Sequence, residues 1–305
     1  MSARKILSLA LCAALSSPLF FSVSHAEVRE SSVGPVEYIG GYPTNETAQK
    51  YYDELDLQRA VEVYLWALPM ASYGAMAEAH YELGAGDHAV IVVDKAAEPQ
   101  QLVLTANQDT IYMSGALDLS KGPMVIDVPA GLLGTMNNIW QQPLVDIGGP
   151  FSPEQNRGGR FLILPPGYDG PMPAVAYHVV ESDTNTVVFY LRAIPQSEAD
   201  LPRLQKLVRT FKQYRLAEAK NPPEMTFVSM TGRKADFLTH EGFEFFESIS
   251  RYVNANPPRP QDMAMLGMLE TLGIAHGREF KPDQRMQEIL TAAAKKGRAM
   301  AEVVA

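Results

Sequence analysis

The sequence predicts an α+β protein with an antiparallel β-sandwich or jelly-roll-like core, an N-terminal helix and C-terminal helices. Apolar side chains recur at helical spacing before residue 82 and again after residue 200. The roughly one hundred residues between them contain eight short runs rich in β-branched and aromatic side chains, separated by Gly, Pro, Asn and Asp. These connections are too short for crossover helices, so a Rossmann-type parallel sheet is excluded.

The first 26 residues have the order of a cleavable secretion signal. Arg4 and Lys5 precede the apolar run 6–15, and small residues end at Ala26. Pro18 interrupts the run before it reaches the roughly 20 residues that a membrane-spanning helix needs. We therefore expect cleavage after Ala26 and a periplasmic or secreted protein without a membrane span after cleavage.

Composition narrows the classes of partner. The formal net charge is −9 and no basic cluster is visible, so phosphate backbones would be repelled and nucleic acid is not expected as a partner. Cys12, the single cysteine, lies in the leader, so the mature chain is expected to fold without disulfides or cysteine metal ligands. No metal site and no cofactor are predicted.

The elements follow in order along the chain. Gly and Pro residues indicate an extended lead-in over 27–52, and a helix is predicted over 53–82, kinked or split at Pro69. The predicted strands are Ala89–Val93, Gln101–Thr105, Thr110–Leu119, Pro123–Val128, Thr135–Ile147, Arg160–Leu164, Ala174–Val180 and Thr186–Ile194. We expect a domain over 53–216 and a mainly helical extension over 217–305.

The pattern becomes helical again at Ser197, a plausible cap. An apolar stripe from Leu201 to Tyr214 predicts a surface helix, with Pro202 tolerated in its first turn. The remaining predicted elements are a strand at Thr226–Met230 and helices at Thr239–Val253, Gln261–Leu272 and Asp283–Val304.

Common enzyme motifs are missing. Gly84-Ala85-Gly86 follows a predicted helix rather than a strand, so it indicates a helix stop and not a dinucleotide loop. His240-Glu241 starts a zinc-protease-like string, but Glu244 stands where the second histidine belongs. Five histidines, His80, His88, His178, His240 and His276, have no ligand spacing, and a hydrogen-bonded structural role is predicted for each.

The segment 105–112 carries the first candidate site. The strand beginning at Thr110 would place Thr110, Tyr112 and Ser114 on one face, opposite Ile111, Met113 and Leu117. One interpretation is an Asx-type turn feeding a half-buried strand. The other has Asp109 and Tyr112 as catalytic acid–base groups in a pocket, with Asn107 binding a ligand.

Two further segments are candidates for ligand binding. Asn137 to Gln142 places amides around Trp140, and such groups either face solvent or line a polar cavity. Arg160 enters a predicted strand after two glycines and would either clamp a ligand carboxylate or pair with a structural carboxylate.

Four segments together resemble a known bacterial family, catalogued as domain of unknown function 1254. They are 107–112, 117–123, 158–161 and 185–192, and the helix 64–69 is similar to that family's opening helix. The resemblance covers about Asp56 to Leu216. It implies a β-sandwich with helical embellishment, often exported and usually followed by a second β domain, catalogued as 1214.

The resemblance leaves the function open, because the family has no agreed reaction. The chain ends inside the expected linking helix, so we expect domain 1214 to be absent or encoded separately. Gly134 to Asn137 replaces an aromatic-rich strand of the family.

Our leading hypothesis is a protein that binds a small polar or amphipathic molecule in a sandwich cavity, with hydrolysis as a further option.

The alternative is a structural or assembly module, either a homo-oligomer or a partner of a separate β domain. It is motivated by an apolar stripe on the last helix, formed by Met286, Ile289, Leu290 and Met300.

Overall fold

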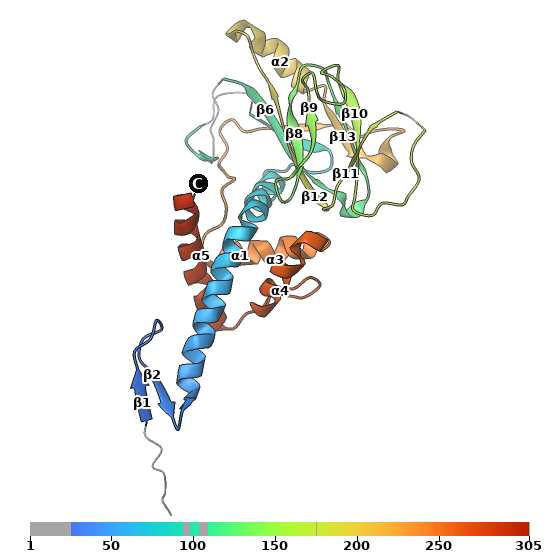
Figure 1. Ribbon diagram of the computed structural model, residues 1–305. Helices are drawn as coiled ribbons and strands as arrows, with labels where there is room; N and C mark the ends of the chain where they lie inside the picture. The colour runs from blue at the N-terminus through green and yellow to red at the C-terminus, as the bar shows by residue number, and fades with distance from the viewer. Residues whose placement is uncertain (1–25, 94–97, 104–108, 175, 305) are drawn as a thin grey trace, which may run out of the picture. The chain divides into compact units, whose positions relative to one another are not determined.

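The computed structural model describes residues 26–93, 98–103, 109–174 and 176–304. It divides into two compact units, Met1–Glu54 and Leu55–Ala305, which are described separately (Figure 1). Residues 1–25 of the predicted leader and the candidate residue Asn107 lie outside the described residues.

The described part of the smaller unit is a three-stranded antiparallel sheet followed by the start of a helix. The elements are β1 (Ala26–Arg29), β2 (Val36–Ile39), β3 (Tyr42–Pro43) and residues 45–54 of α1 (Asn45–Glu82). The helix prediction is wrong at its start, because α1 begins at Asn45 and not at residue 53. The Thr44 hydroxyl accepts the Thr47 amide at 3.2 Å and caps this first turn, which carries no apolar stripe.

The larger unit contains the β-sandwich. Its strands are β4 (Ala89–Val93), β5 (Gln101–Leu102), β6 (Ile111–Asp118), β7 (Met124–Val128), β8 (Leu133–Asn138), β9 (Pro143–Ile147), β10 (Gly159–Leu164), β11 (His178–Glu181), β12 (Thr186–Ala193), β13 (Lys212–Arg215), β14 (Thr226–Ser229) and β15 (Ala235–Asp236). In the described part of the chain they form a six-stranded sheet β14-β4-β6-β12-β8-β9, a four-stranded sheet β11-β10-β7-β13 and a small pair β15-β5.

The helices of the larger unit are the rest of α1, α2 (Leu201–Val208), α3 (Gly242–Ala255), α4 (Met263–Thr271) and α5 (Gln284–Val304), with short 3-10 turns η1 (Leu119–Lys121), η2 (Glu198–Asp200), η3 (Leu216–Glu218) and η4 (Pro260–Asp262). The α+β class, the N-terminal helix and the C-terminal helices confirm the predicted fold. Pairing is antiparallel except for β10 with β11, β14 with β4, and β15 with β5, which are parallel.

One apolar cluster fills the space between the two large sheets. Strand β6 shows how the sequence builds it, because Ile111, Met113 and Leu117 are buried in this cluster. Tyr112 and Ser114 therefore point to the outer face of the six-stranded sheet, as the alternation of side chains along a strand requires. The predicted division of faces on this strand is confirmed.

A helical layer packs against the outer face of the same sheet. Buried side chains of α1, α3, α4 and α5 share a second apolar cluster with Ala116 and Val188 of the sheet. Figure 1 shows α3, α4 and α5 grouped around α1, with the sheets at its C-terminal end. Helix α1 continues through Pro69, so of the two predicted outcomes, a kink or a split, the split does not occur. Neighbouring residues Ala67, Met70 and Ala71 are all buried, so tertiary packing outweighs the lost backbone hydrogen bond.

Two further predictions of element bounds are wrong. The strand expected over 135–147 is a hairpin of β8 and β9, because Gln141 turns the chain with φ 61° and the Asn138 side chain accepts two amides of the turn. Gly134 on β8 is constrained by contact, since an added Cβ would lie 1.8 Å from the Tyr190 carbonyl oxygen.

The helix expected to reach Tyr214 ends at Val208. Phe211 then packs in the core between the two sheets, and Tyr214 lies on strand β13. The prediction extended the helix too far because the apolar residues keep a helical spacing by chance beyond Val208.

Candidate functional site

A cavity of about 370 Å³ lies between α1 and the outer face of the six-stranded sheet. Its lining residues are Ser72, Tyr73, Met76, Ile91, Val93, Gln101, Val103, Tyr112, Ser114, Gln141, Tyr190, Met230 and Phe237. The predicted location was between the two sheets. That space holds large, fully buried side chains such as Phe161 and Phe189, and this cavity lies outside it.

Strand register and helix periodicity explain this lining. Ser114 of β6 stands opposite Ile91 of β4 on one side and Tyr190 of β12 on the other. All three side chains project from the same face of the sheet. Across from them, Ser72, Tyr73 and Met76 share one face of α1 at spacings of three and four residues. One helix face and three neighbouring strands thus meet at the cavity.

Ser114 forms a hydrogen bond with the buried imidazole of His80. The His80 Nε2 to Ser114 Oγ distance is 2.8 Å, and His80 Nδ1 lies 2.6 Å from the carbonyl oxygen of Met76. A carbonyl can only accept, so Nδ1 of the neutral ring carries the proton and Nε2 accepts from the serine hydroxyl. The Phe237 ring packs edge-on against the imidazole, with centroids 5.4 Å apart.

Burial holds His80 in its neutral form. The side chain is fully buried, and this loss of hydration lowers its pKa from 6.5 to about 4, although the Met76 carbonyl opposes the shift. At neutral pH the Nε2 atom is therefore unprotonated, and its lone pair points at the Ser114 hydroxyl.

Two tyrosines form another wall of the cavity. The rings of Tyr73 and Tyr190 meet edge-on with centroids 5.9 Å apart, and the Tyr190 hydroxyl donates to the Met76 sulfur at 2.7 Å. Asn137 donates to the Tyr73 hydroxyl at 2.7 Å. Burial, followed by the proximity of Tyr73, raises the pKa of Tyr190. The Tyr190 hydroxyl is therefore a protonated hydrogen-bonding group at ordinary pH.

A second hollow, of about 480 Å³, adjoins the first and shares Tyr112 and Tyr190 with it. Arg192 and Asp146 line it, and within the described residues neither makes a hydrogen bond or an ion pair. Its rim is the loop 148–152, which is held by buried Glu154. One Glu154 carboxylate oxygen accepts the Gly148 amide at 2.5 Å and the Ser152 hydroxyl at 2.8 Å.

The predicted catalytic residues lie at the start of β6. Tyr112 lines both hollows and is half-buried. Asp109 is exposed and precedes the strand by two residues. Neither residue has a tested role, so the acid–base assignment stays a prediction.

Trp140 and Arg160, the predicted ligand-binding residues, are not brought to this cavity's lining. Trp140 packs on the ring of Trp66 with centroids 4.6 Å apart, beneath the guanidinium of Arg259. Arg160 alternates with the inward-facing Phe161, so it lies on the outer face of the four-stranded sheet, on the opposite side of the sandwich from Tyr112. Its guanidinium stands 5.2 Å from the Tyr177 ring centroid. Their ligand-binding roles also stay predictions.

Sequence reasoning did not identify His80, Tyr73 and Tyr190 as cavity residues. His80 was expected to be structural, and it does make two hydrogen bonds. Only the same-face prediction for Tyr112 and Ser114 pointed toward the cavity. No local motif links His80 to Ser114, because they lie on different elements separated by 34 positions.

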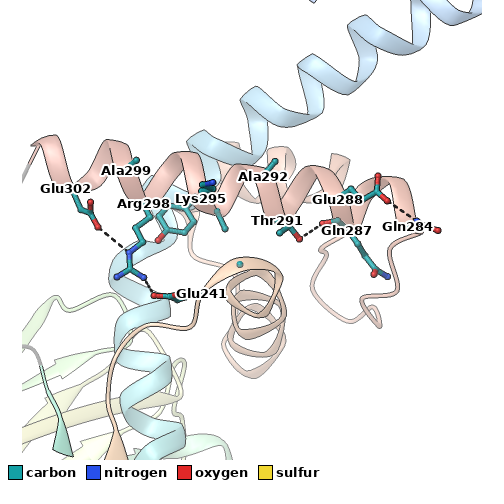
Figure 2. Close-up of a pocket in the computed structure, with 13 residues that line it drawn as sticks. Glu241, Gln284, Gln287, Glu288, Thr291, Ala292, Lys295, Arg298, Ala299 and Glu302 are labelled. Atoms are coloured by element: carbon teal, nitrogen blue, oxygen red, sulfur yellow. Dashed lines mark hydrogen bonds and ion pairs between the residues drawn. The ribbon is translucent and has the colours of Figure 1, made fainter. Parts of the chain in front are cut away.

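A separate groove of about 790 Å³ runs along α5 (Figure 2). Arg298 reaches across it to Glu241 and also pairs with Glu302, and all three side chains are well exposed. Solvent-exposed pairs of this kind contribute little to stability. The α5 stripe that motivated an assembly role is largely packed within the chain, since Leu290 is buried and Met286 packs against the helical core.

Two features are absent from the part of the chain that the structure describes. Among the described residues, no group of three or more His, Cys, Asp or Glu side chains is arranged to hold a metal ion. Within the same residues, no helix has the length and apolarity to cross a membrane.

The fold and the cavity define a two-layered β-sandwich protein with a helical layer over one sheet and a small-molecule-sized hollow beneath that layer. A family model described as "Protein of unknown function (DUF1254)" matches residues 89–215 of the chain. The matched range runs from β4 to β13 and includes Tyr112, Ser114 and Tyr190. His80 on α1 precedes it.

A solved structure gives the same fold. The chain is similar to the VPA0106 protein from Vibrio parahaemolyticus, with 17% sequence identity and a TM-score of 0.58. The similarity covers 82% of this chain and 59% of that one, so the chain spans less than two thirds of its relative. No curated protein matches the chain.

Proposed function

We propose that the protein binds a small amphipathic molecule in the cavity between α1 and the six-stranded sheet. The observation that carries this proposal is the composition of the cavity wall. One part is apolar, with Met76, Ile91 and Phe237, and another presents hydroxyls and amides, with Tyr112 and Gln101. A volume of about 370 Å³ is in the range of small-molecule sites.

The adjoining hollow supports a polar end for such a ligand. Arg192 stands directly opposite Tyr112 in the strand pairing, and both line this second space. An arginine that makes no ion pair with the described residues is available to a carboxylate or phosphate. We propose that the apolar part of the ligand lies under α1 and that its polar end points toward Arg192.

Val93→Trp is expected to weaken binding at least tenfold, because the larger ring would occupy the cavity. The probe is 1-anilinonaphthalene-8-sulfonate, an anionic amphiphile whose fluorescence rises in apolar surroundings. Fluorescence titration should show one saturable site per chain in the unchanged protein. The matched control is Ala292→Trp in the α5 groove, which should leave affinity unchanged. Equal losses in both variants, or none in Val93→Trp at an unchanged thermal midpoint, would contradict the proposal.

We also propose that the protein is exported, on the basis of the leader pattern in residues 1–26. Expression in a bacterial host with an intact secretion system should yield a mature chain beginning at Glu27. Intact-mass measurement of the periplasmic fraction gives this directly. A chain that keeps Met1 and stays in the cytoplasm would rule export out.

A further inference from the structure

We propose that Ser114 and His80 form a nucleophile–base dyad and that the cavity is the active site of a hydrolase acting on small carboxylic esters. The inference rests on the proposed function, because it requires that a small molecule enter this cavity. It extends that function from binding to a reaction, and it assigns the nucleophile and the base to residues other than the predicted acid–base pair Asp109 and Tyr112.

The hydrogen-bond directions are those that nucleophilic catalysis requires. The Met76 carbonyl, 2.6 Å from Nδ1, holds the proton on that nitrogen and orients the ring. Nε2 then faces the Ser114 hydroxyl at 2.8 Å as an acceptor. A serine hydroxyl becomes a useful nucleophile when an oriented base lies within this distance. In a triad, the third group fixes the tautomer and orientation of this base and stabilises the imidazolium that forms. Here a backbone carbonyl occupies the place that a carboxylate takes in a triad.

The surroundings place this hydroxyl where a substrate could meet it. Ser114 is half-buried and lines the cavity, whereas His80 behind it is fully buried. Burial also keeps the imidazole unprotonated, with its pKa lowered to about 4. The Tyr112 hydroxyl lines the same space from the next outward position on β6 and makes no hydrogen bond to a described residue. It is the available donor for the oxyanion of a tetrahedral intermediate.

The reaction balances with water as the second reactant. As the Ser114 Oγ bonds to the ester carbonyl carbon, its proton passes to His80 Nε2. Collapse of the intermediate breaks the bond to the alcohol oxygen, which takes that proton and leaves. Water then attacks the acyl-serine and gives a proton to Nε2. The serine oxygen recovers this proton as the acid departs, so one ester and one water yield one acid and one alcohol.

The cavity wall selects an ester with a short apolar acyl group. Met76, Ile91 and Phe237 form an apolar surface beside Ser114. An ester is favoured over an amide because an alcohol is a far better leaving group than an amine, so the reaction demands less of a base without a carboxylate partner.

The test uses 4-nitrophenyl butyrate turnover and a fluorophosphonate, which phosphonylates activated serines with loss of fluoride. The unchanged protein should hydrolyse the ester and take up one label, mapped to Ser114 by peptide mass spectrometry. Ser114→Ala should lower kcat/KM at least 100-fold and abolish the label, and His80→Gln should also abolish it. The matched control is Ser120→Ala, an exposed serine in η1, which should keep full turnover.

Dye binding separates this proposal from the proposed function. Ser114→Ala should still bind 1-anilinonaphthalene-8-sulfonate at one site with an unchanged thermal midpoint or a small shift. Intact dye binding with no turnover and no label in the unchanged protein would overturn the dyad and leave binding in place. Turnover that survives Ser114→Ala, or a label on another residue, would also overturn it. If the unchanged protein does not bind the dye at all, both proposals are overturned.

Discussion

Replacing Arg259 by methionine is expected to lower the free energy of unfolding by about 3–5 kcal/mol, because it leaves a buried carboxylate without its partner. Arg259 is only 5% exposed, and its Nε lies 2.5 Å from the Asp262 carboxylate, which is also buried. Its Nη1 donates to the Gln142 amide oxygen at 2.7 Å and lies 3.1 Å from the exposed Asp183 carboxylate. The guanidinium also covers the Trp140 ring, 4.7 Å from its centroid.

Urea denaturation monitored by circular dichroism measures this loss. The matched control is Arg278→Met, since Arg278 pairs with Glu270 at 3.1 Å in solvent and should cost less than about 1 kcal/mol. The double variant Arg259→Met with Asp262→Leu should recover much of the stability, because it removes the orphaned charge. A loss for Arg259→Met no larger than that for Arg278→Met would show that the buried Arg259–Asp262 pair stabilises the fold no more than an exposed ion pair does.

The second large effect is a loss of stability between about pH 6.5 and pH 4 that depends on His80. The unfolded chain protonates this histidine below its ordinary pKa of 6.5, whereas burial lowers the folded pKa to about 4. In this window the unfolded state binds more protons, so the free energy of unfolding falls as the pH falls. The full shift corresponds to about 3 kcal/mol, present above pH 6.5 and lost on passing through pH 4.

The measurement is the urea midpoint at pH 7.5 and at pH 4.5 for the unchanged protein and for His80→Gln. Glutamine cannot be protonated, so the variant should lose less stability between these two values. The matched control is His276→Gln, which removes a histidine that bonds the Val253 carbonyl and leaves the His80 contribution in place. Identical pH dependence in the unchanged protein and His80→Gln would show that the ring is protonated without unfolding.

Sequence patterns predicted the structure correctly where the two faces of a single strand pack against different surroundings. Alternation along β6 correctly divided Ile111 and Met113 from Tyr112 and Ser114, because a strand between a core and a helical layer must sort its side chains by face. The same rules failed where tertiary contacts override them. Phe211 extends a helical stripe without belonging to the helix, because its side chain packs into the core between the two sheets.

The candidate site shows the same division. Tyr112 could be chosen from sequence because it stands beside Ser114 on one face. Arg160 had an equally plausible local pattern, yet the fold places it on the far sheet. Residues on different strands share a site only if sheet order and register allow it, and single-strand patterns carry no information on either.

The amino-acid sequence by itself determined the order of helix, sandwich and helices, the inward and outward faces of β6, and the resemblance to the family whose model matches residues 89–215. These follow from spacing along the chain. Tertiary structure alone decided that α1 covers the six-stranded sheet, that the cavity opens there, and that His80 meets Ser114. The physical reason is that these contacts form between layers whose residues lie far apart in the sequence. A short-range pattern carries no information on how such layers pack.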